Sequence, residues 1–497
     1  MSIGLSYEEL AATPVREMSM GLALSWQAAR EPDRPALSMG EVTYTRLELD
    51  QAANRMARTF ASLGVRQGSK VAVLLQTGPM HHIVCFGLWK IGATVIPLSW
   101  RLVDSELEKI LGAADPELVV GVEPGRLPGF RTLPPDIAVD PTVPGDPMPE
   151  VLSPIWKAST SGGSTGIPKL IWDRRPSLIH PFQPMALLKI DVDDTILHPA
   201  AAYHNSPFCQ VNWALCWGAN VVLMGRFDAE AWLREVERHR IRWAYLVPTM
   251  MSRILNLPRE LREAADVSSI RIAMHMAAPC PDWVKAGWIE WLGPERIWEV
   301  YAGTEGYGST LLSGEEWLAH RGTVGQAPAG AEVRDEEGRA LPPGEVGALY
   351  FPAPLGNRAN LAPGYYTYGD MGWVDADGYL YIADRRTDMI VSGGGNLYPA
   401  EIEAAIEQYP GVVAAAVIGL PDADLGSVPH AIVELEPEAR QPTPQELLAF
   451  LGEKLARTKH PRSVEFTREP LRDDAGKMRR SRLRQARLSA AREPARA

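Results

Sequence analysis

Short apolar runs alternate with helix-like segments through the first two-thirds of the 497-residue chain. Lys70–Gln76 is an apolar run typical of a buried strand, and His81–Ile91 follows with the spacing of a helix. The same order returns where Ile270–Ala278 is strand-like and Asp282–Leu292 is helix-like. Strands that alternate with helices indicate parallel sheets covered by helices. We therefore predict an α/β fold of layered sheets and helices. Further strand-like runs are Thr94–Ser99, Glu117–Val122, Ile241–Pro248 and Arg296–Ala302, and Ser105–Ala113 is helix-like.

A polar segment, Asp384–Asp388, interrupts this pattern and separates two parts of the chain. Beyond it the spacing becomes that of a smaller α+β domain. Thr443 is predicted to cap a helix there, because a proline follows at the first helical position and a glutamate completes a capping box. Single cores seldom exceed about 300 residues. We therefore predict a large N-terminal domain of several subdomains over residues 1–386 and a small, mobile C-terminal domain over residues 387–497.

Composition and charge exclude several classes of protein. With hydrophobic residues at 46% and charged residues at 22%, the chain can bury a core. Its net charge of −11 argues against a nucleic-acid partner, since neutralising phosphates needs excess cations. We expect no membrane span and no signal peptide, because the sequence has neither a long apolar run nor a basic start before one. Reduced thiols in a cytoplasmic protein are favoured by the absence of a Cys-x-x-Cys pair among Cys85, Cys209, Cys216 and Cys280.

One segment, Ser159–Lys169, reads STSGGSTGIPK and combines glycines, hydroxyl residues and a lysine. Glycines let successive backbone N–H groups converge on an anion, hydroxyls add donors, and the lysine adds a charge. The segment differs from a Walker A loop, because Ile167 and Pro168 separate Gly166 from the lysine. A Gly/Ser-rich stretch is often a flexible linker, but its place within the α/β pattern favours a phosphate-binding loop.

Further motifs follow in order along the chain: YAGTEG at Tyr301–Gly306, TYGDMG at Thr367–Gly372, DRRTD at Asp384–Asp388, and DDAGK, which ends at Lys477. Together with the glycine-rich segment they resemble the AMP-forming adenylating enzymes. That superfamily includes acyl- and aryl-CoA synthetases, firefly-type luciferases and the adenylation domains of peptide synthetases. The resemblance extends over nearly the whole chain. It is strongest to the branch of bile-acid and steroid CoA ligases, which also contains ATP-dependent diazotases.

The resemblance implies a site for ATP and Mg²⁺. Tyr301 would stack on adenine, Thr304 would bond a phosphate, and Glu305 would bind Mg²⁺, a hard cation that takes oxygen ligands. Asp370 would accept hydrogen bonds from the ribose hydroxyls, although Tyr368 close to it departs from the family pattern. The nucleotide-binding residues implied are Thr160, Ser161, Gly162, Gly163, Ser164, Thr165, Gly166, Lys169, Ala278, Tyr301, Thr304, Asp370 and Arg385.

The resemblance also implies a two-step reaction, in which a carboxylate and ATP give an acyl-adenylate and a thiol then displaces AMP. Lys477, His204 and Glu305 would serve catalysis, with the Lys477 ammonium stabilising charge at the α-phosphate. Between the steps the C-terminal domain would turn about Thr387, which also departs from the usual family residues. Gly394 would then approach the pantetheine arm of coenzyme A.

The substrate is implied by two further segments. Tyr203–Trp217 resembles the segment that lines the acyl pocket of the family, and His275–Pro279 resembles one that lines the adenine and acyl pockets. Tyr203–Trp217 contains no acidic residue, which argues against an α-amino acid, whose ammonium needs a partner charge. We therefore expect an apolar or aryl carboxylic acid, with coenzyme A as acceptor. The pocket residues implied are Tyr203, Asn205, Phe208, Trp213, Met276, Ala277 and Gly303.

Three other functions stay open. A diazotase would activate nitrite with ATP and transfer nitrogen to an arylamine without coenzyme A. Transfer to a carrier protein would keep the first step and change the acceptor. A nucleotide-binding protein without activity would release no pyrophosphate with any acid. The sequence also leaves open whether the chain forms a homodimer.

Overall fold

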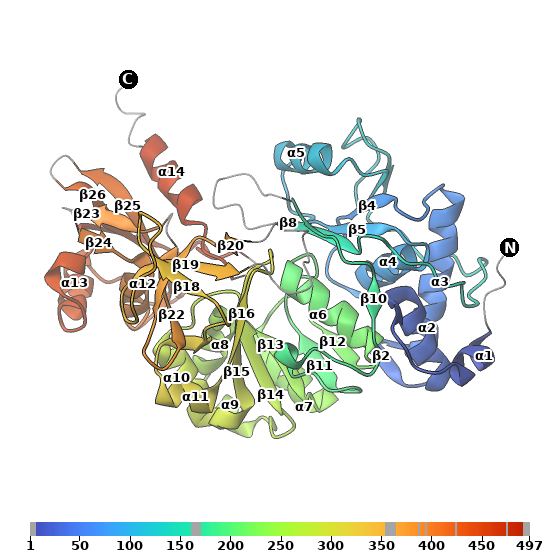
Figure 1. Cartoon of the computed structure of the whole chain (residues 1–497). Helices are drawn as coiled ribbons and strands as arrows, with labels where there is room; N and C mark the ends of the chain where they lie inside the picture. Colours follow the sequence, from blue (N-terminus) through green and yellow to red (C-terminus); the bar gives the residue numbers. More distant parts are fainter. Residues whose placement is uncertain are drawn as a thin grey trace.

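The predicted alternation of strands and helices forms two large, mainly parallel sheets (Figure 1). This computed structural model describes residues 6–160, 170–352, 364–385, 388–392, 395–422, 425–473 and 476–490. The first sheet has the strand order β7-β6-β4-β5-β8-β9, and β9 pairs with β8 in the antiparallel sense. Its strands are β4 (Lys70–Val73), β5 (Thr94–Pro97), β6 (Leu118–Val120), β7 (Thr132–Leu133), β8 (Lys157–Thr160) and β9 (Leu170–Asp173).

The second sheet has the strand order β16-β15-β14-β13-β11-β12-β2-β3. It is parallel from β15 to β2, and the two edge strands, β3 and β16, pair in the antiparallel sense. Its strands are β2 (Pro35–Met39), β3 (Val42–Thr45), β11 (Thr195–His198), β12 (Asn220–Leu223), β13 (Trp243–Leu246), β14 (Ile272–Met276), β15 (Ile297–Ala302) and β16 (Ser309–Ser313).

A single apolar core joins the two sheets. It includes helix α4 (Pro79–Lys90), which is buried from His81 to its last residue, and helix α6 (Asn205–Cys216). A helix without a polar face is stable only inside a protein. Lys90 at the end of α4 forms a buried ion pair with Asp50 at 2.7 Å. The other helices of this part are α1 (Tyr7–Ala12), α2 (Met20–Arg30), α3 (Arg46–Ser62), α5 (Asp104–Ala114), α7 (Ala229–His239), α8 (Pro248–Leu255), α9 (Arg259–Ala264), α10 (Asp282–Leu292) and α11 (Gly314–Ala319).

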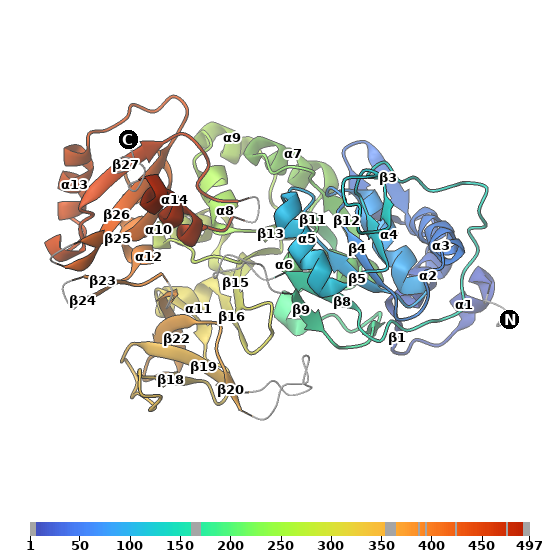
Figure 2. The same cartoon turned by 90° about the horizontal axis from the view of Figure 1, so that it is seen from above.

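A third, antiparallel sheet follows β16 and forms a β lobe beside the two-sheet body (Figure 2). Its order is β17-β22-β21-β19-β18, with β20 paired to β19. It has a small core of its own around Leu349, Phe351 and Leu380. Its strands are β17 (Thr323–Gln326), β18 (Glu332–Arg334), β19 (Gly347–Pro352), β20 (Tyr365–Tyr366), β21 (Asp370–Val374) and β22 (Tyr379–Arg385).

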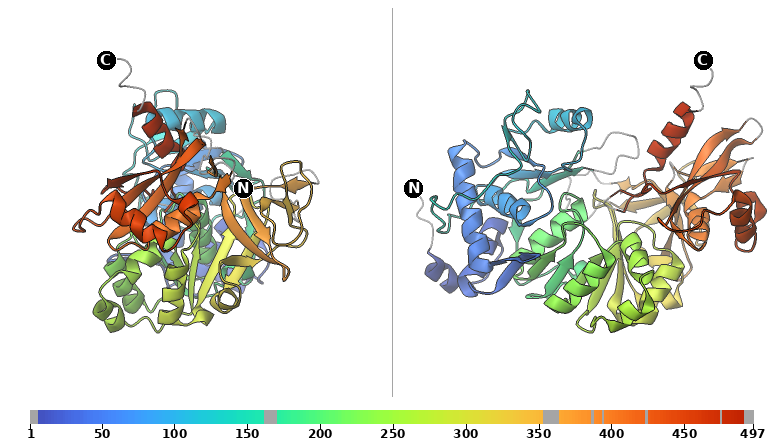
Figure 3. Two further views of the ribbon diagram at one scale, coloured as in Figure 1. Left: turned by 90° about the vertical axis from the view of Figure 1, so that its left-hand side faces the viewer. Right: turned by 180° about the vertical axis from the view of Figure 1, so that it is seen from behind.

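The C-terminal domain has a separate core and lies at the opposite end of the molecule from α1 (Figure 3, right). The predicted capping box of its helix α13 (Pro444–Gly452) is confirmed, because the Thr443 hydroxyl accepts from the Glu446 N–H and the Glu446 carboxylate accepts in return. Its other elements are β23 (Ile390–Ser392), β24 (Gly395–Leu397), α12 (Pro399–Ile406), β25 (Val412–Asp422), β26 (Gly426–Leu435), β27 (Ser463–Thr467) and α14 (Arg480–Ala490).

The predicted α/β class is therefore confirmed, with an α+β domain at the C-terminal end. The predicted boundary at residues 386 and 387 lies outside the described residues. Within the described ranges, no helix is both long and apolar enough to cross a membrane.

Candidate active site

Several predicted site residues gather at the carboxyl ends of the parallel strands of the second sheet. Met276 ends β14, and Ala302 ends β15. The strand register pairs Met276 with Val300, so the two ends are adjacent. Open α/β sheets bind their ligands at this edge. The residues that follow these two strands there are Ala277, Ala278, Gly303, Thr304 and Glu305.

Ala277 has a left-handed backbone, with a φ of 76°. For a residue with a Cβ this conformation costs about 1–2 kcal/mol. Such strain persists where the surrounding structure imposes it, often at functional sites. The turn ends β14 after Met276 and leaves Ala277 exposed at the sheet edge. The sequence predicted a strand as far as Ala278, and this turn is why the strand ends earlier.

A hydrogen bond joins two predicted nucleotide-binding residues. The Tyr301 hydroxyl, at the end of β15, donates to Asp370 Oδ2 at 2.7 Å. Asp370 is buried at the start of β21, where its backbone pairs with that of Arg385 on β22. The bond therefore fixes the β lobe against the second sheet. It holds an aromatic ring and a carboxylate together at the edge where the nucleotide is predicted to bind.

Tyr368 supports the turn that carries Thr304 and Glu305. Its ring lies directly against Gly303, where an added Cβ would be 2.2 Å from the ring. Its hydroxyl donates to Gly308 O at 2.8 Å and accepts from Gly308 N at 2.9 Å. Burial raises the pKa of Tyr368 to about 12, so the hydroxyl keeps its proton. The departure from the family pattern at this position thus has a structural role.

The start of α6 presents the predicted acyl-pocket residues. His204 precedes α6, and its ring lies 4.7 Å from that of the buried Tyr203. Trp213 is half-buried and stacks on Trp156 at 5.5 Å. At the end of β14, Met276 Sδ accepts a hydrogen bond from Ser206 Oγ at 2.9 Å. The residues of α6 and β14 that were predicted to line the acyl pocket therefore lie next to both aromatic and polar groups.

Phe208, another predicted pocket residue, lies among aromatic side chains of the core. It is fully buried in the core shared by the two sheets. Its ring packs 5.8 Å from that of Trp89 and 6.1 Å from that of Trp156. Phe208 therefore packs the core beside α6, and its predicted place in the acyl pocket stays a prediction.

A hairpin of the C-terminal domain brings Lys477 toward the same sheet edge. Asp473 Oδ1 accepts from the Lys477 N–H at 2.9 Å, and Arg472 and Met478 pair across the hairpin. Gly476 has a φ of 73°, and a Cβ there would lie 3.1 Å from Val247. Val247 follows β13, so the hairpin meets the two-sheet body where that strand ends.

Elsewhere the two domains are joined by the hydrogen bond that Ala400 N–H donates to Asp384 Oδ2 at 2.8 Å, and a cavity lies between them. A cavity of about 550 Å³ separates the segment Pro279–Trp283, which follows β14, from α12 and the residues after it. On the C-terminal side its wall contains Glu407, which pairs with Arg472 at 3.0 Å. Burial raises the pKa of Glu407, although Arg472 opposes that rise.

Part of the predicted site lies outside the described residues. Thr160, by contrast, ends β8 and is half-buried, and Arg385 ends β22. The predicted residues outside the described ranges are Ser161, Gly162, Gly163, Ser164, Thr165, Gly166, Lys169, Thr387 and Gly394.

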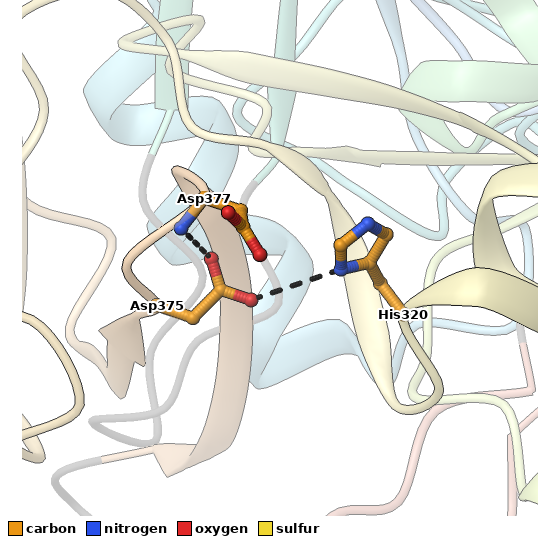
Figure 4. Close-up of side chains that lie close together, drawn as sticks. All are labelled: His320, Asp375 and Asp377. Carbon is orange, nitrogen blue, oxygen red and sulfur yellow. Dashed lines mark hydrogen bonds and ion pairs between the residues drawn. The ribbon is translucent and has the colours of Figure 1, made fainter.

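In the described part of the chain, one group of side chains has the composition of a metal site: His320, Asp375 and Asp377, whose ligand atoms lie within 4.8 Å of one another (Figure 4). Asp375 and Asp377 lie in the turn between β21 and β22, and His320 follows α11. Asp375 Oδ1 accepts hydrogen bonds from the backbone N–H groups of Asp377 at 3.0 Å and Tyr379 at 2.8 Å. Stabilising this turn is therefore a sufficient role for the Asp375 carboxylate. The predicted magnesium ligand, Glu305, is not part of this group.

Sequence reasoning missed a polar group beside the pocket. Lys157 Nζ donates to Asn205 Oδ1 at 2.5 Å and is buried at the start of β8. The available signal was a lysine at the start of a strand otherwise made of small residues. Its partner on α6 is distant in sequence, so no local pattern indicated the contact.

Comparisons with known proteins decide the family. The model of the AMP-binding enzyme family matches residues 24–154 and 158–366, and the model of the AMP-binding enzyme C-terminal domain matches residues 401–477. The chain belongs to the AMP-binding enzyme family. A feruloyl-CoA synthase of Amycolatopsis is 32% identical to this AMP-binding enzyme, over 93% of the chain and 98% of the relative. A long-chain-fatty-acid–CoA ligase of Mycobacterium tuberculosis is 30% identical, over 90% of the chain and 93% of the relative.

Solved structures agree with this assignment. The o-succinylbenzoate CoA synthetase of Bacillus subtilis, in complex with its acyl-adenylate intermediate, matches with a TM-score of 0.78 at 25% identity. The match covers 94% of this AMP-binding enzyme and 98% of that chain. The same synthetase in complex with ATP and a magnesium ion matches with a TM-score of 0.77. The expected closeness to the bile-acid and steroid branch stays a prediction.

The described residues fit an adenine nucleotide with a magnesium ion. Tyr301 offers an aromatic ring whose position is set by its bond to Asp370. Two residues after the end of β15, Thr304 offers a hydroxyl, and Glu305 next to it offers a half-buried carboxylate. Carboxylate and phosphate oxygens together are the usual ligands of Mg²⁺. The donor set therefore has the chemistry that the family's nucleotide requires.

Proposed function

We propose that this AMP-binding enzyme is an AMP-forming carboxylate–CoA ligase that activates an apolar or aryl acid with ATP and Mg²⁺. One observation carries the proposal: the Lys477 hairpin of one domain meets the other at the end of β13, at the same carboxyl edge of the sheet where β15, two strands away, leads to Tyr301 and Glu305. A lysine brought to this edge would suit a reaction that develops negative charge on phosphate.

In the first step, an oxygen of the acid's carboxylate bonds to the α-phosphorus of ATP, and pyrophosphate leaves. The protein positions the reactants and stabilises charge, because phosphoryl transfer requires little covalent chemistry from protein side chains. Tyr301 and Asp370 would orient the nucleoside, and Glu305 would hold Mg²⁺. His204 would border the carboxylate, and the Lys477 ammonium would stabilise the charge that develops on the transferred phosphate.

In the second step, the sulfur of coenzyme A bonds to the acyl carbon, and AMP leaves. The C-terminal domain would turn between the steps, so that a second face of this domain replaces the Lys477 hairpin. Its separate core allows such a movement without unfolding. The relatives reported above are CoA ligases by name, which supports coenzyme A as the acceptor. None of those relatives is a diazotase by name, and the diazotase alternative gains no support from them.

The test compares acceptors on one purified enzyme. Pyrophosphate release is measured with ATP, Mg²⁺ and a panel of alkyl and aryl acids, and the products are identified by mass spectrometry. An acyl-CoA formed only when coenzyme A is added supports the proposal. A diazo compound formed from nitrite and an arylamine, or an acyl group found only on a carrier protein, contradicts it. Absence of pyrophosphate with every acid would indicate a nucleotide-binding protein without activity.

We also propose a cytoplasmic location, where ATP and coenzyme A are available and thiols stay reduced. All four cysteines remain thiols, which supports this proposal. Light scattering of the purified enzyme distinguishes a monomer from the homodimer that the sequence left open.

A further inference from the structure

A lysine ammonium lies buried beside the predicted acyl pocket. Lys157 begins β8, and the residue is only 3% exposed. Its Nζ donates to Asn205 Oδ1 at 2.5 Å and to Ser159 Oγ at 3.0 Å. The ring of Trp156 lies 5.0 Å from the same nitrogen. An ammonium has three N–H groups, so these two acceptors leave one N–H for a further partner.

The charge of Lys157 is not balanced by the described residues around it. No carboxylate in the described ranges forms an ion pair with Lys157 within 4.0 Å. Asp173 lies opposite it on β9, but the two oxygens of Asp173 bond Arg175 at 2.8 and 2.6 Å. Burial would raise the pKa of Asp173, yet Arg175 and Lys157 hold it below its ordinary value. The group therefore contains two cations and one carboxylate, and a buried charge without a partner is costly.

The surroundings of this ammonium are those of the acyl pocket. Its partner Asn205 is the first residue of α6 and one of the predicted pocket residues. The ring of Trp156, which faces the ammonium, stacks on the half-buried Trp213 with an interplanar angle of 25°. Trp156 is buried, so the half-buried Trp213 offers the aromatic surface near this cation for a flat ring that carries a negative group.

The ammonium lies where the predicted acyl pocket meets the start of the glycine-rich segment. Ser159 and Thr160, which end β8, are the first two residues of the glycine-rich segment. Thr160 lies three residue steps, about 10 Å, along the strand from Lys157. The hydrogen bonds to Ser159 Oγ and Asn205 Oδ1 hold the ammonium between β8 and the start of α6.

We propose that Lys157, with Ser159 and Asn205, binds a second carboxylate of the acid, so that the preferred substrates are aromatic dicarboxylic acids. This inference rests on the proposed function and names its substrate class. The second carboxylate takes the unused N–H of Lys157 and neutralises the group, while Trp213 lies beside the ring. Lys157 thus determines specificity and takes no part in the bond-making steps.

The first test compares 4-carboxycinnamic acid with cinnamic acid, which differ only in the second carboxylate. Hydrogen bonds to charged groups are strong enough that we expect wild-type kcat/KM to be about 10- to 100-fold higher for the diacid. Lys157→Met should remove this preference through KM of the diacid, with KM for ATP unchanged. Lys157→Arg, which keeps the charge, should retain much of it. Lys109→Met, at an exposed lysine of α5, is the matched control and should change nothing.

Other outcomes would overturn the inference. These are a wild-type enzyme that favours cinnamic acid, a Lys157→Met variant that loses activity equally with both acids, or one that raises KM for ATP. Calorimetric titration of the diacid into wild type and Lys157→Met distinguishes this inference from the proposed function. Weaker binding to the variant alone supports the site even if neither acid were activated, and equal binding contradicts it.

Discussion

Gly303 should tolerate no side chain, because Tyr368 occupies the space where one would begin. An added Cβ would lie 2.2 Å from Cε1 and 2.4 Å from Cδ1 of Tyr368. Carbon atoms in contact normally lie about 3.5–4.0 Å apart. Gly303→Ala must therefore displace either the ring or the turn by more than 1 Å. The ring is held by two hydrogen bonds to Gly308, so we expect the turn that carries Thr304 and Glu305 to move.

The size of the effect follows from this displacement. A reacting group misplaced by about 1 Å loses about 100-fold in rate. We expect Gly303→Ala to lower kcat/KM for ATP by about this factor in an ATP–pyrophosphate exchange assay. Overpacking should also lower the free energy of unfolding by about 1–3 kcal/mol. Gly112→Ala is the matched control, since Gly112 lies on α5 with nothing within 4 Å of an added Cβ.

A second variant tests the cause. Tyr368→Ala opens the space beside residue 303, so the double variant Gly303→Ala/Tyr368→Ala should recover part of the activity that Gly303→Ala loses. Full activity of Gly303→Ala, or a loss of equal size in Gly112→Ala, would refute the reasoning. So would a double variant no better than the single one, because the ring would then not be the obstacle.

Three further predictions concern other residues. Lys477→Ala should abolish adenylate formation and leave thioester formation from a supplied acyl-adenylate mostly intact, and equal loss of both half-reactions would contradict its role. Glu305→Gln should raise the Mg²⁺ concentration needed for half-maximal pyrophosphate release, and an unchanged requirement would remove Glu305 as the ligand. Lys90→Met leaves the buried carboxylate of Asp50 without its cation and should lower the free energy of unfolding by about 3–5 kcal/mol, measured by urea denaturation. A change below 1 kcal/mol would show that the other hydrogen bonds to Asp50 suffice.

Local sequence patterns predicted the fold well. The helix predicted over Asp282–Leu292 has those bounds in the structure, because proline precedes it and glycine follows it. The strand predicted over Ile270–Ala278 is shorter, ending at Met276, because Ala277 adopts a positive φ that alanine seldom takes. Periodicity indicates which residues can form a strand, but it does not indicate where a turn is imposed by neighbouring segments.

Contacts between distant segments were beyond such reasoning. Tyr301 and Asp370 are joined although 69 positions separate them, and motif resemblance named both residues without indicating their bond. Phe208 lies on a helix expected to line the pocket, yet only the packing of two sheets decides which face of that helix is buried. The contact between Lys157 and Asn205 had no local signal, because 48 positions separate the two residues.

The cavity between the two domains has an energetic consequence. The residues that line this cavity of about 550 Å³ do not pack across it, so they lose no contact there when the domains part. Apolar burial stabilises by about 25 cal/mol per Å². A large apolar interface would therefore stabilise one domain orientation so strongly that the enzyme could not leave it in every catalytic cycle. The contacts that join the domains include the approach of Gly476 to Val247 and the hydrogen bond that Ala400 N–H donates to Asp384 Oδ2 at 2.8 Å, and two orientations that exchange such contacts can lie within a few kcal/mol. The bound ligand would then determine which of the two orientations the enzyme adopts.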